Sequence, residues 1–218
     1  MSSKNVKSLL FSEFARVSKA LGSGNRLELL EFLAQGERSV DAVAKLSGLS
    51  VANTSRHLQV LRQVGLVTAR KEGLFVYYSV TGEGVIRLLA ALQEVAQHNV
   101  AEVTHLVNTY LTSKDSLEPV SVNDLVERMR SGLVTVVDVR PTEEYAAGHL
   151  PGAINVPLAD IEKNAGRLPR DREVIAYCRG PFCVLSFEAV AQLRKKGLRA
   201  RRLETGFPEW KVAGLPVE

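Results

Sequence analysis

The stretch "SVDAVAKLSGLSVANTSRHLQVLRQVG", from Ser39 to Gly65, decides the fold of the first half of the chain. It predicts two short helices, because Ser39 and Ser50 are suited to cap helix N-termini and Gly65 is suited to end the second helix. The turn "SGLS" between them is brief, so the pair has the form of a helix-turn-helix. The second helix has an apolar face that we expect to pack against the preceding helices, formed by Val51, Leu58, Leu61 and Val64.

The polar residues of this second helix predict contact with DNA. In a major groove, Arg can bond guanine, Asn can bond adenine, and Ser or His can bond phosphates and base edges. The alternative is a polar face that is merely solvated, which is common for helices in general. The residues that we predict to bind DNA from this helix are Asn53, Thr54, Ser55, Arg56, His57, Gln59 and Arg62.

The next stretch, "LVTARKEGLFVYYSV", favours the DNA-binding interpretation. It predicts a hairpin that turns at Glu72-Gly73, and its first arm ends in Arg70 and Lys71, which we add to the DNA-binding residues. The stretch from Arg38 to Lys71 contains six basic residues and one acidic residue, although the net charge of the whole chain is only +4. Such a local excess suits neutralisation of a phosphate backbone.

These motifs resemble the ArsR family of winged-helix transcriptional repressors over residues 7–112, most specifically in "SRHLQVLRQVGLV". The resemblance implies a homodimer that binds a double-stranded DNA operator. Residues 81–111 independently predict one helix of about thirty residues, whose apolar stripe is too long for a small domain to cover. We therefore expect a homodimer formed through this helix and the N-terminal helix. Its two-fold symmetry predicts an inverted-repeat operator.

A metal site on the same long helix is a weaker hypothesis. His98, Glu102 and His105 lie at i, i+4 and i+7 and would share one face of a continuous helix, a geometry adequate for a zinc site that bridges a dimer. The helix offers no convincing fourth ligand, and polar residues at this spacing usually mark a solvated stripe. No cysteine precedes Cys178, which excludes thiolate-based sensing of arsenite or cadmium in this half. We predict no metal.

The second half of the chain alternates short strands with helices, unlike the mainly helical first half. The two halves together predict a mainly-α winged helix-turn-helix domain followed by an α/β domain with a central parallel sheet. "LVTVVDVR", "GAINVP", "EVIAYC" and "RARRLE" are short strands that alternate with helical segments. "LTSKDSLEPVS" lacks periodicity. We expect domains at residues 1–112 and 121–218, joined by a linker at 113–120.

Both cysteines of the chain lie in "YCRGPFC", Tyr177 to Cys183. A strand delivers Cys178 to the carboxyl edge of the sheet, and a helix follows from Cys183. Nearby helix N–H groups and Arg179 favour an anion, so we expect a lowered thiol pKa and a nucleophilic Cys178. The alternative is a buried structural cysteine. A phosphatase-type loop would need an arginine where Val184 stands, so phosphatase and arsenate reductase activities are excluded.

The second half resembles a rhodanese domain over residues 121–218, through "VVDVRPTEEYAAGHLPGAINVPL", "YCRGPFC" and "LETGFPEWKVAGLPV". The resemblance implies that Cys178 carries sulfur, without a metal or organic cofactor. It also implies that Asp138 and Arg140 support the loop side, and that His149 and Trp210 are packing residues. Thr205 stands before Gly206 where the family commonly has a second glycine. The remaining loop residues are Arg179, Gly180, Pro181, Phe182 and Cys183.

The implied chemistry is sulfur transfer, in which Cys178 attacks a sulfane sulfur and becomes a persulfide. Cys183 is either a small packing residue or the partner that resolves a modified Cys178, and the spacing leaves both open. We expect a regulator that senses reactive sulfur or redox state. The alternative is a sulfurtransferase whose winged helix tethers it to DNA or regulates its own gene. The sulfur donor would be thiosulfate, polysulfide or a small persulfide.

Composition and charge limit the remaining possibilities. No apolar stretch is long enough to span a membrane, and Glu13 and Arg16 interrupt any export signal, so we expect a cytoplasmic protein with reduced thiols. The basic cluster "RKKGLRARR" at 194–202 would allow a second DNA contact. A solvated surface or a guarded sheet edge is the interpretation that we favour.

Overall fold

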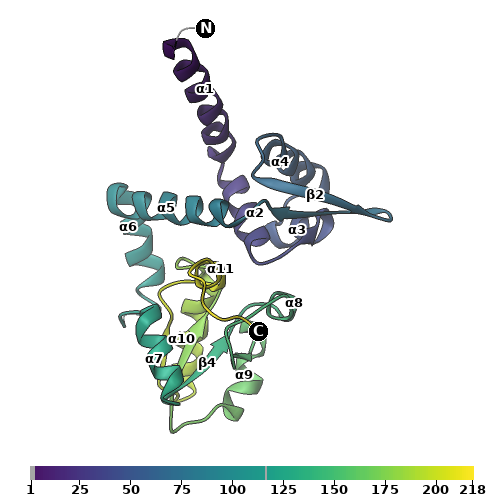
Figure 1. The fold of residues 1–218 in the computed structure, drawn as a ribbon. Helices are drawn as coiled ribbons and strands as arrows, with labels where there is room; N and C mark the ends of the chain where they lie inside the picture. The colour runs from purple at the N-terminus through teal and green to yellow at the C-terminus, as the bar shows by residue number, and fades with distance from the viewer. Residues whose placement is uncertain (1–2, 116) are drawn as a thin grey trace. The chain divides into compact units, whose positions relative to one another are not determined.

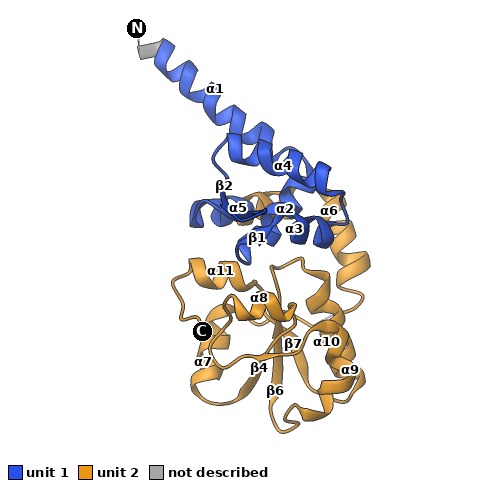
Figure 2. Ribbon diagram, turned by 90° about the vertical axis from the view of Figure 1, so that its right-hand side faces the viewer, with its two compact units in different colours: residues 1–89 blue, residues 90–218 orange. Residues whose placement is uncertain are grey.

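The computed structural model describes residues 3–115 and 117–218, which form two compact units at residues 1–89 and 90–218 (Figures 1 and 2). The division falls inside α5 (Glu83–Asn99). The domain boundaries predicted at 112 and 121 therefore do not coincide with the compact units and stay a prediction. The fold class is confirmed, since a winged helix-turn-helix precedes an α/β domain with a parallel sheet.

The first unit places two helices before the helix-turn-helix and a hairpin after it. The hairpin strands and a short third strand form an antiparallel sheet in the order β1-β3-β2. Glu72 pairs with Phe75 across the predicted turn. The elements are α1 (Ser3–Leu21), α2 (Gly24–Ala34), β1 (Arg38–Ser39), α3 (Val40–Ser47), α4 (Val51–Gln63), β2 (Val67–Glu72), β3 (Phe75–Val80) and the start of α5.

The helix-turn-helix forms as the local sequence predicts. The Ser39 hydroxyl accepts a hydrogen bond from the N–H of Ala42, and the Ser50 hydroxyl accepts one from Asn53, so both predicted caps are confirmed. Gly48 ends α3 with a φ of 68°, a left-handed conformation that glycine adopts without strain.

The buried face of α4 begins one turn later than predicted. Leu58 and Leu61 are fully buried in the core with Leu29, but Val51 is 48% exposed. Thr54, Leu58 and Leu61 lie at i, i+4 and i+7 and share the buried face, whereas Val51 is the first residue of the helix. The prediction that Val51 is buried was therefore wrong.

The predicted continuous helix over 81–111 is also wrong. It is interrupted at Val100, which has extended angles (φ −107°, ψ 103°), and resumes as α6 (Ala101–Leu106) and a π-helical turn (Val107–Leu111). The β-branched Val100 weakens the helix, and the Asn99 side chain donates instead to the carbonyl of Val95.

The second unit contains the predicted parallel sheet, in the strand order β5-β4-β6-β7. Helices cover both faces, because alternate residues of β4 and β6 belong to two separate cores (Figure 2). The main elements are α7 (Val122–Arg130), β4 (Val134–Asp138), α8 (Thr142–Ala146), β5 (Ile154–Asn155), α9 (Ile161–Asn164), β6 (Glu173–Tyr177), α10 (Val184–Lys195), β7 (Ala200–Arg202) and α11 (Phe207–Val212). Short 3₁₀ turns lie at Leu158–Asp160 and Ala165–Arg167.

The predicted linker is held on this sheet rather than free. Its residue Ser116 lies outside the described part of the chain. The carboxylate of Asp115 is buried and pairs with Arg194 at 2.9 Å and with Arg202 at 3.5 Å. The N–H of Val120 donates to the carbonyl of Arg202, which extends the edge of the sheet beyond β7.

These contacts change the interpretation of the basic cluster at 194–202. Arg194 and Arg202 bind Asp115, and Arg201 donates to the carbonyl of Glu118. Three of its arginines thus fix the connecting segment to the sheet edge, a role that the sequence interpretation missed. Among the described residues, no helix is both long and apolar enough to cross a membrane.

Candidate functional site

The cysteine-containing loop lies where the sequence placed it, between a strand and a helix. β6 ends at Tyr177, Cys178 follows directly, and Cys183 is the N-cap residue of α10. The N–H of Cys183 donates to the carbonyl of Gly180, and the N–H of Phe207 donates to the carbonyl of Cys178. The loop is therefore closed on itself and held from a neighbouring segment.

The two thiols meet inside this loop. The Sγ atoms of Cys178 and Cys183 lie 2.6 Å apart, and the two residues are not joined by a disulfide. Cys178 is 1% exposed and Cys183 is 8% exposed. The sequence spacing left open whether these sulfurs could approach each other, and the structure brings them into contact.

The expectation of a lowered Cys178 pKa was wrong. Burial raises the pKa of the Cys178 thiol well above its ordinary value, and the neighbouring Cys183 thiol raises it further. The N–H and the charge of Arg179 act in the opposite direction without outweighing burial. The strand end carries Cys178 into the core beside Val137 and Val190, and this depth is not visible in the sequence.

Glu144 is a residue of this site that the sequence interpretation missed. Its buried carboxylate accepts hydrogen bonds from Arg179 Nε at 3.0 Å and from Arg179 Nη2 at 2.7 Å. This pairing fixes the guanidinium and offsets part of its charge. Glu144 lies in the quoted motif "TEEYAAGH", but the sequence did not show which of the two adjacent glutamates turns inward.

The predicted DNA-binding residues on α4 divide by exposure. Arg56, Gln59 and Arg62 are exposed, and Asn53, Ser55 and His57 are half-buried. Thr54 is fully buried, so its inclusion among DNA contacts is corrected: it lies on the core face of α4 above Leu58.

At the hairpin, Lys71 is exposed but Arg70 is engaged within the protein. The guanidinium of Arg70 pairs with Glu37 at 2.6 Å and also with Glu72, and it lies over the ring of Tyr77. Glu37 and Glu72 lie just outside the range in which basic residues were counted. Residues 37–72 contain six basic and three acidic residues, so the local excess of positive charge is smaller than predicted.

The three residues considered for a metal site do not share one helical face. His98 lies in α5 and Glu102 and His105 lie in α6, and the break at Val100 removes the shared helical face that the hypothesis required. Within residues 3–115 and 117–218, no group of three His, Cys, Asp or Glu side chains is arranged to hold a metal ion.

Comparisons with known proteins match a different family to each half of the chain. The profile described as "Bacterial regulatory protein, arsR family" matches residues 23–69, and that of the "Rhodanese-like domain" matches residues 121–213. The HTH-type transcriptional regulator Rv0324 of Mycobacterium tuberculosis is 45% identical over 212 residues, which cover 97% of this chain and 93% of that protein. The chain belongs to the arsR family and carries a rhodanese-like domain.

Other relatives match one half each. A sulfurtransferase of Allochromatium vinosum is 35% identical to this arsR-family chain over 85 residues. The aligned region covers 38% of this chain and 78% of the sulfurtransferase. The homodimeric winged helix-turn-helix DNA-binding domain of Mb0332 from Mycobacterium bovis, described as a possible ArsR-family regulator, is 45% identical. The matched region covers 46% of this chain and 91% of the Mycobacterium bovis chain, with a TM-score of 0.42.

Beneath the loop of the rhodanese-like domain lies a buried polar network around Asp138 and Arg140. The two side chains are fully buried and paired at 2.6 Å, and Arg140 also donates to the carbonyl of Gly148. The Tyr177 hydroxyl donates to Asp138 at 2.5 Å and accepts from the N–H of Leu150. Burial and Asp138 raise the pKa of Tyr177, so this hydroxyl stays protonated. Because Tyr177 precedes Cys178 directly, the network fixes the base of the loop.

Gly206 holds the loop of the rhodanese-like domain from the side. A Cβ atom added at Gly206 would lie under 3.0 Å from backbone atoms of Arg179 and Gly180. Thr205 departs from the family pattern, but the close approach occurs at the next residue, Gly206, where glycine is present. Gly180 is buried, and Pro181 and Phe182 are half-buried.

The two other motif residues of the rhodanese-like domain make packing contacts. Trp210 is 2% exposed and donates to the carbonyl of Pro216. His149 stacks on the ring of Tyr145 with centroids 3.7 Å apart.

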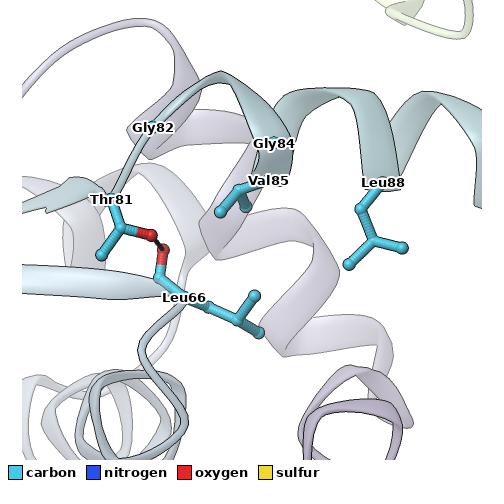
Figure 3. A pocket seen from close by; sticks show the side chains of 6 residues that line it. All are labelled: Leu66, Thr81, Gly82, Gly84, Val85 and Leu88. Atoms are coloured by element: carbon cyan, nitrogen blue, oxygen red, sulfur yellow. Dashed lines mark hydrogen bonds between the residues drawn. The ribbon is translucent and has the colours of Figure 1, made fainter. Parts of the chain in front are cut away.

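A shallow apolar hollow of about 270 Å³ lies at the start of α5 in the arsR-family unit (Figure 3). The Thr81 hydroxyl closes one side by donating to the carbonyls of Gly65 and Leu66. The side chains of Leu66 and Leu88 border the hollow, and Leu88 is 39% exposed. A polar ligand would find few partners there, so the hollow suits an apolar side chain.

Proposed function

We propose that this arsR-family protein is a homodimeric, operator-binding regulator in which Cys178 takes up sulfane sulfur as a persulfide and thereby changes affinity for DNA. The observation that carries the proposal is the placement of the thiols. Both cysteines lie in one loop of the rhodanese-like domain, and the DNA-binding unit has none. A thiol-based signal must therefore begin in the rhodanese-like domain.

Exposed apolar surface supports the homodimer. Large apolar side chains of two helices face solvent in the single chain, and such surface commonly marks a protein interface. The homodimeric relative from Mycobacterium bovis agrees with this interpretation. The side chains are Leu9, Leu10, Phe11 and Phe14 on α1, and Leu88, Leu92 and Val95 on α5.

The exposed face of α4 supports operator binding. Arg56, Gln59 and Arg62 are accessible from solvent, and Lys71 adds an exposed charge on the hairpin. In a two-fold dimer, two such helices would enter successive major grooves about 34 Å apart, which predicts an inverted-repeat operator. Arg70 would contribute less, because Glu37 and Glu72 already bind its guanidinium.

Sulfur uptake follows from the nucleophilicity of a thiolate in the loop. The Cys178 thiolate attacks the outer sulfur of a small persulfide, forms a new S–S bond and releases the donor's thiolate. Because burial raises the pKa of Cys178, this thiol must lose its proton before it attacks the donor.

A second candidate is a sulfurtransferase that turns over repeatedly, which the relative from Allochromatium vinosum favours. The two candidates differ in stoichiometry. A sensor takes up sulfur once per loop, whereas an enzyme passes it repeatedly from thiosulfate or polysulfide to an acceptor thiol.

Cys178→Ser is expected to abolish the response of operator binding to sulfur. We expect glutathione persulfide to change the operator affinity of the full-length protein by about 5-fold to 150-fold, the usual range of allosteric coupling. The variant should bind the same DNA without responding, because it lacks the attacking thiol. The measurement is operator binding by fluorescence anisotropy, with intact-protein mass spectrometry on the same sample.

Arg56→Ala is the matched control, since it should weaken binding with and without the donor while persulfide formation stays intact. An unchanged response in Cys178→Ser would refute the proposal. Rapid multiple turnover, with no change in DNA affinity, would favour the sulfurtransferase.

A further inference from the structure

We propose that Cys183 resolves the persulfide on Cys178, forming a Cys178–Cys183 disulfide and releasing hydrosulfide. This proposal rests on sulfur uptake by Cys178. It is carried by the position of the two Sγ atoms, which lie 2.6 Å apart within a single loop. This separation is somewhat longer than a disulfide bond of about 2.05 Å, so bond formation needs only a small shift.

The atoms and electrons of the resolving step balance. The Cys183 thiolate attacks Sγ of Cys178, and the bond between Sγ and the outer sulfur breaks as the new S–S bond forms. The two cysteine sulfurs together lose two electrons. The sulfane sulfur gains them and leaves as hydrosulfide, and the thiol proton of Cys183 passes to solvent.

Cys183 packs in the same core as Cys178, and its side chain faces the Cys178 thiol. Cys183 occupies the N-cap of α10, yet its side chain caps no N–H group, although Ser, Thr, Asp and Asn are preferred there. Val184, the next residue, is exposed, so the chain turns Cys183 inward toward Cys178 while its neighbour faces solvent.

Cys183→Ser tests the proposal in a variant that should fold, because serine suits an N-cap. Full-length protein is treated with one equivalent of glutathione persulfide, and released sulfide and intact mass are measured. Wild-type protein is expected to release one sulfide per chain and to lose two hydrogens in mass. Cys183→Ser is expected to gain one sulfur atom and to release no sulfide.

The outcomes separate the two proposals. A stable persulfide in wild-type protein without sulfide release, or equal release from Cys183→Ser, would overturn the role of Cys183 and leave sulfur uptake intact. Absence of any sulfur transfer to wild-type protein would overturn the proposed function itself. Cys183→Ala provides the same test without a hydroxyl.

A second inference comes from an independent feature, the buried carboxylate of Asp115. We infer that Asp115 is the point through which the state of the cysteine loop reaches α5. Its side chain is fully buried and ion-paired with Arg194 of α10 and Arg202 of β7. Burial lowers the pKa of Arg202, and the charge of Asp115 opposes this effect. Asp115 therefore stabilises the charged form of Arg202.

α10 connects the loop with Asp115. The helix begins directly after Cys183, and Arg194 lies in its last turn. Its length of 12 residues corresponds to about 18 Å, and Phe187, Val190 and Leu193 are buried along it, so a shift at its start moves the helix as a body.

Asp115 lies on the chain segment that leads back to α5. The described residues before it form the π-helical turn at Val107–Leu111 and α6, which follow α5 without a long loop. Lys114 adds a second tie to α10 through Glu188 at 2.5 Å. A displacement of α10 is thus transmitted to a segment that continues into the DNA-binding unit.

Asp115→Asn tests this relay, because it removes the charge and keeps the shape. The variant should still bind operator and still take up sulfur at Cys178, but its response to glutathione persulfide should fall below about twofold, against 5-fold or more for wild-type protein. Glu118→Gln is the matched control, since it removes a nearby charge whose side chain is exposed and leaves the carbonyl that Arg201 binds.

A full response in Asp115→Asn would overturn the relay. No response in wild-type protein would instead overturn the proposed function. If Asp115→Asn fails to fold, Arg194→Lys keeps the charge but shortens the reach of the side chain. A full response in this variant would likewise count against the relay.

Discussion

Arg140→Ala is expected to lower the free energy of unfolding of the rhodanese-like domain by about 3–5 kcal/mol, the usual cost of breaking a buried ion pair. The change removes the partner of Asp138, whose carboxylate has no access to solvent. It also removes the donor to Gly148 and the cation over the ring of Phe207. The remaining Tyr177 hydroxyl cannot compensate a buried negative charge.

The stability loss can be followed with the single tryptophan of the chain, because Trp210 is buried in this domain. Chemical denaturation of wild-type protein and Arg140→Ala should give different midpoints. Arg167→Ala is the control, since Arg167 is exposed in the same domain and its loss should change stability by less than about 0.5 kcal/mol. An Arg140→Ala protein within about 1 kcal/mol of wild type would contradict the structural role.

The features that the sequence predicted correctly are those with local signals. Ser39, Ser50 and Gly65 mark helix ends through their own backbone preferences, so the helix-turn-helix could be predicted without knowledge of its surroundings. The strand ending at Tyr177 and the helix after Cys183 have equally local patterns. The position of the cysteine loop was therefore predictable.

The features that were missed depend on contacts between distant residues. Cys178 has a raised pKa because of the core around it, and Arg70 is bound by Glu37 from 33 positions away. Asp115 was assigned to a linker because its arginine partners follow it by about eighty residues. Periodicity cannot report such pairings, since it describes only neighbours along one element.

Gly206→Ala is expected to slow persulfide formation on Cys178 by about 100-fold, the cost of a misplacement of about 1 Å at a reacting group. The φ angle of Gly206 is −106°, which alanine adopts readily, so backbone strain has no part in the effect. The added Cβ would instead meet the backbone of Arg179 and Gly180 at under 3.0 Å. Since these atoms belong to the loop itself, the loop must move.

The displacement should also weaken the hydrogen bond from the N–H of Phe207 to the carbonyl of Cys178, because Phe207 directly follows the substituted residue. The rate of sulfur uptake is measured by mass spectrometry, as the loss of unreacted protein after glutathione persulfide is added. Gly166→Ala is the matched control: a Cβ there meets nothing within 4 Å, so the rate should stay at the wild-type value. If folded Gly206→Ala reacts as fast as wild-type protein, the loop tolerates displacement, and its closed geometry is not what positions Cys178 for attack.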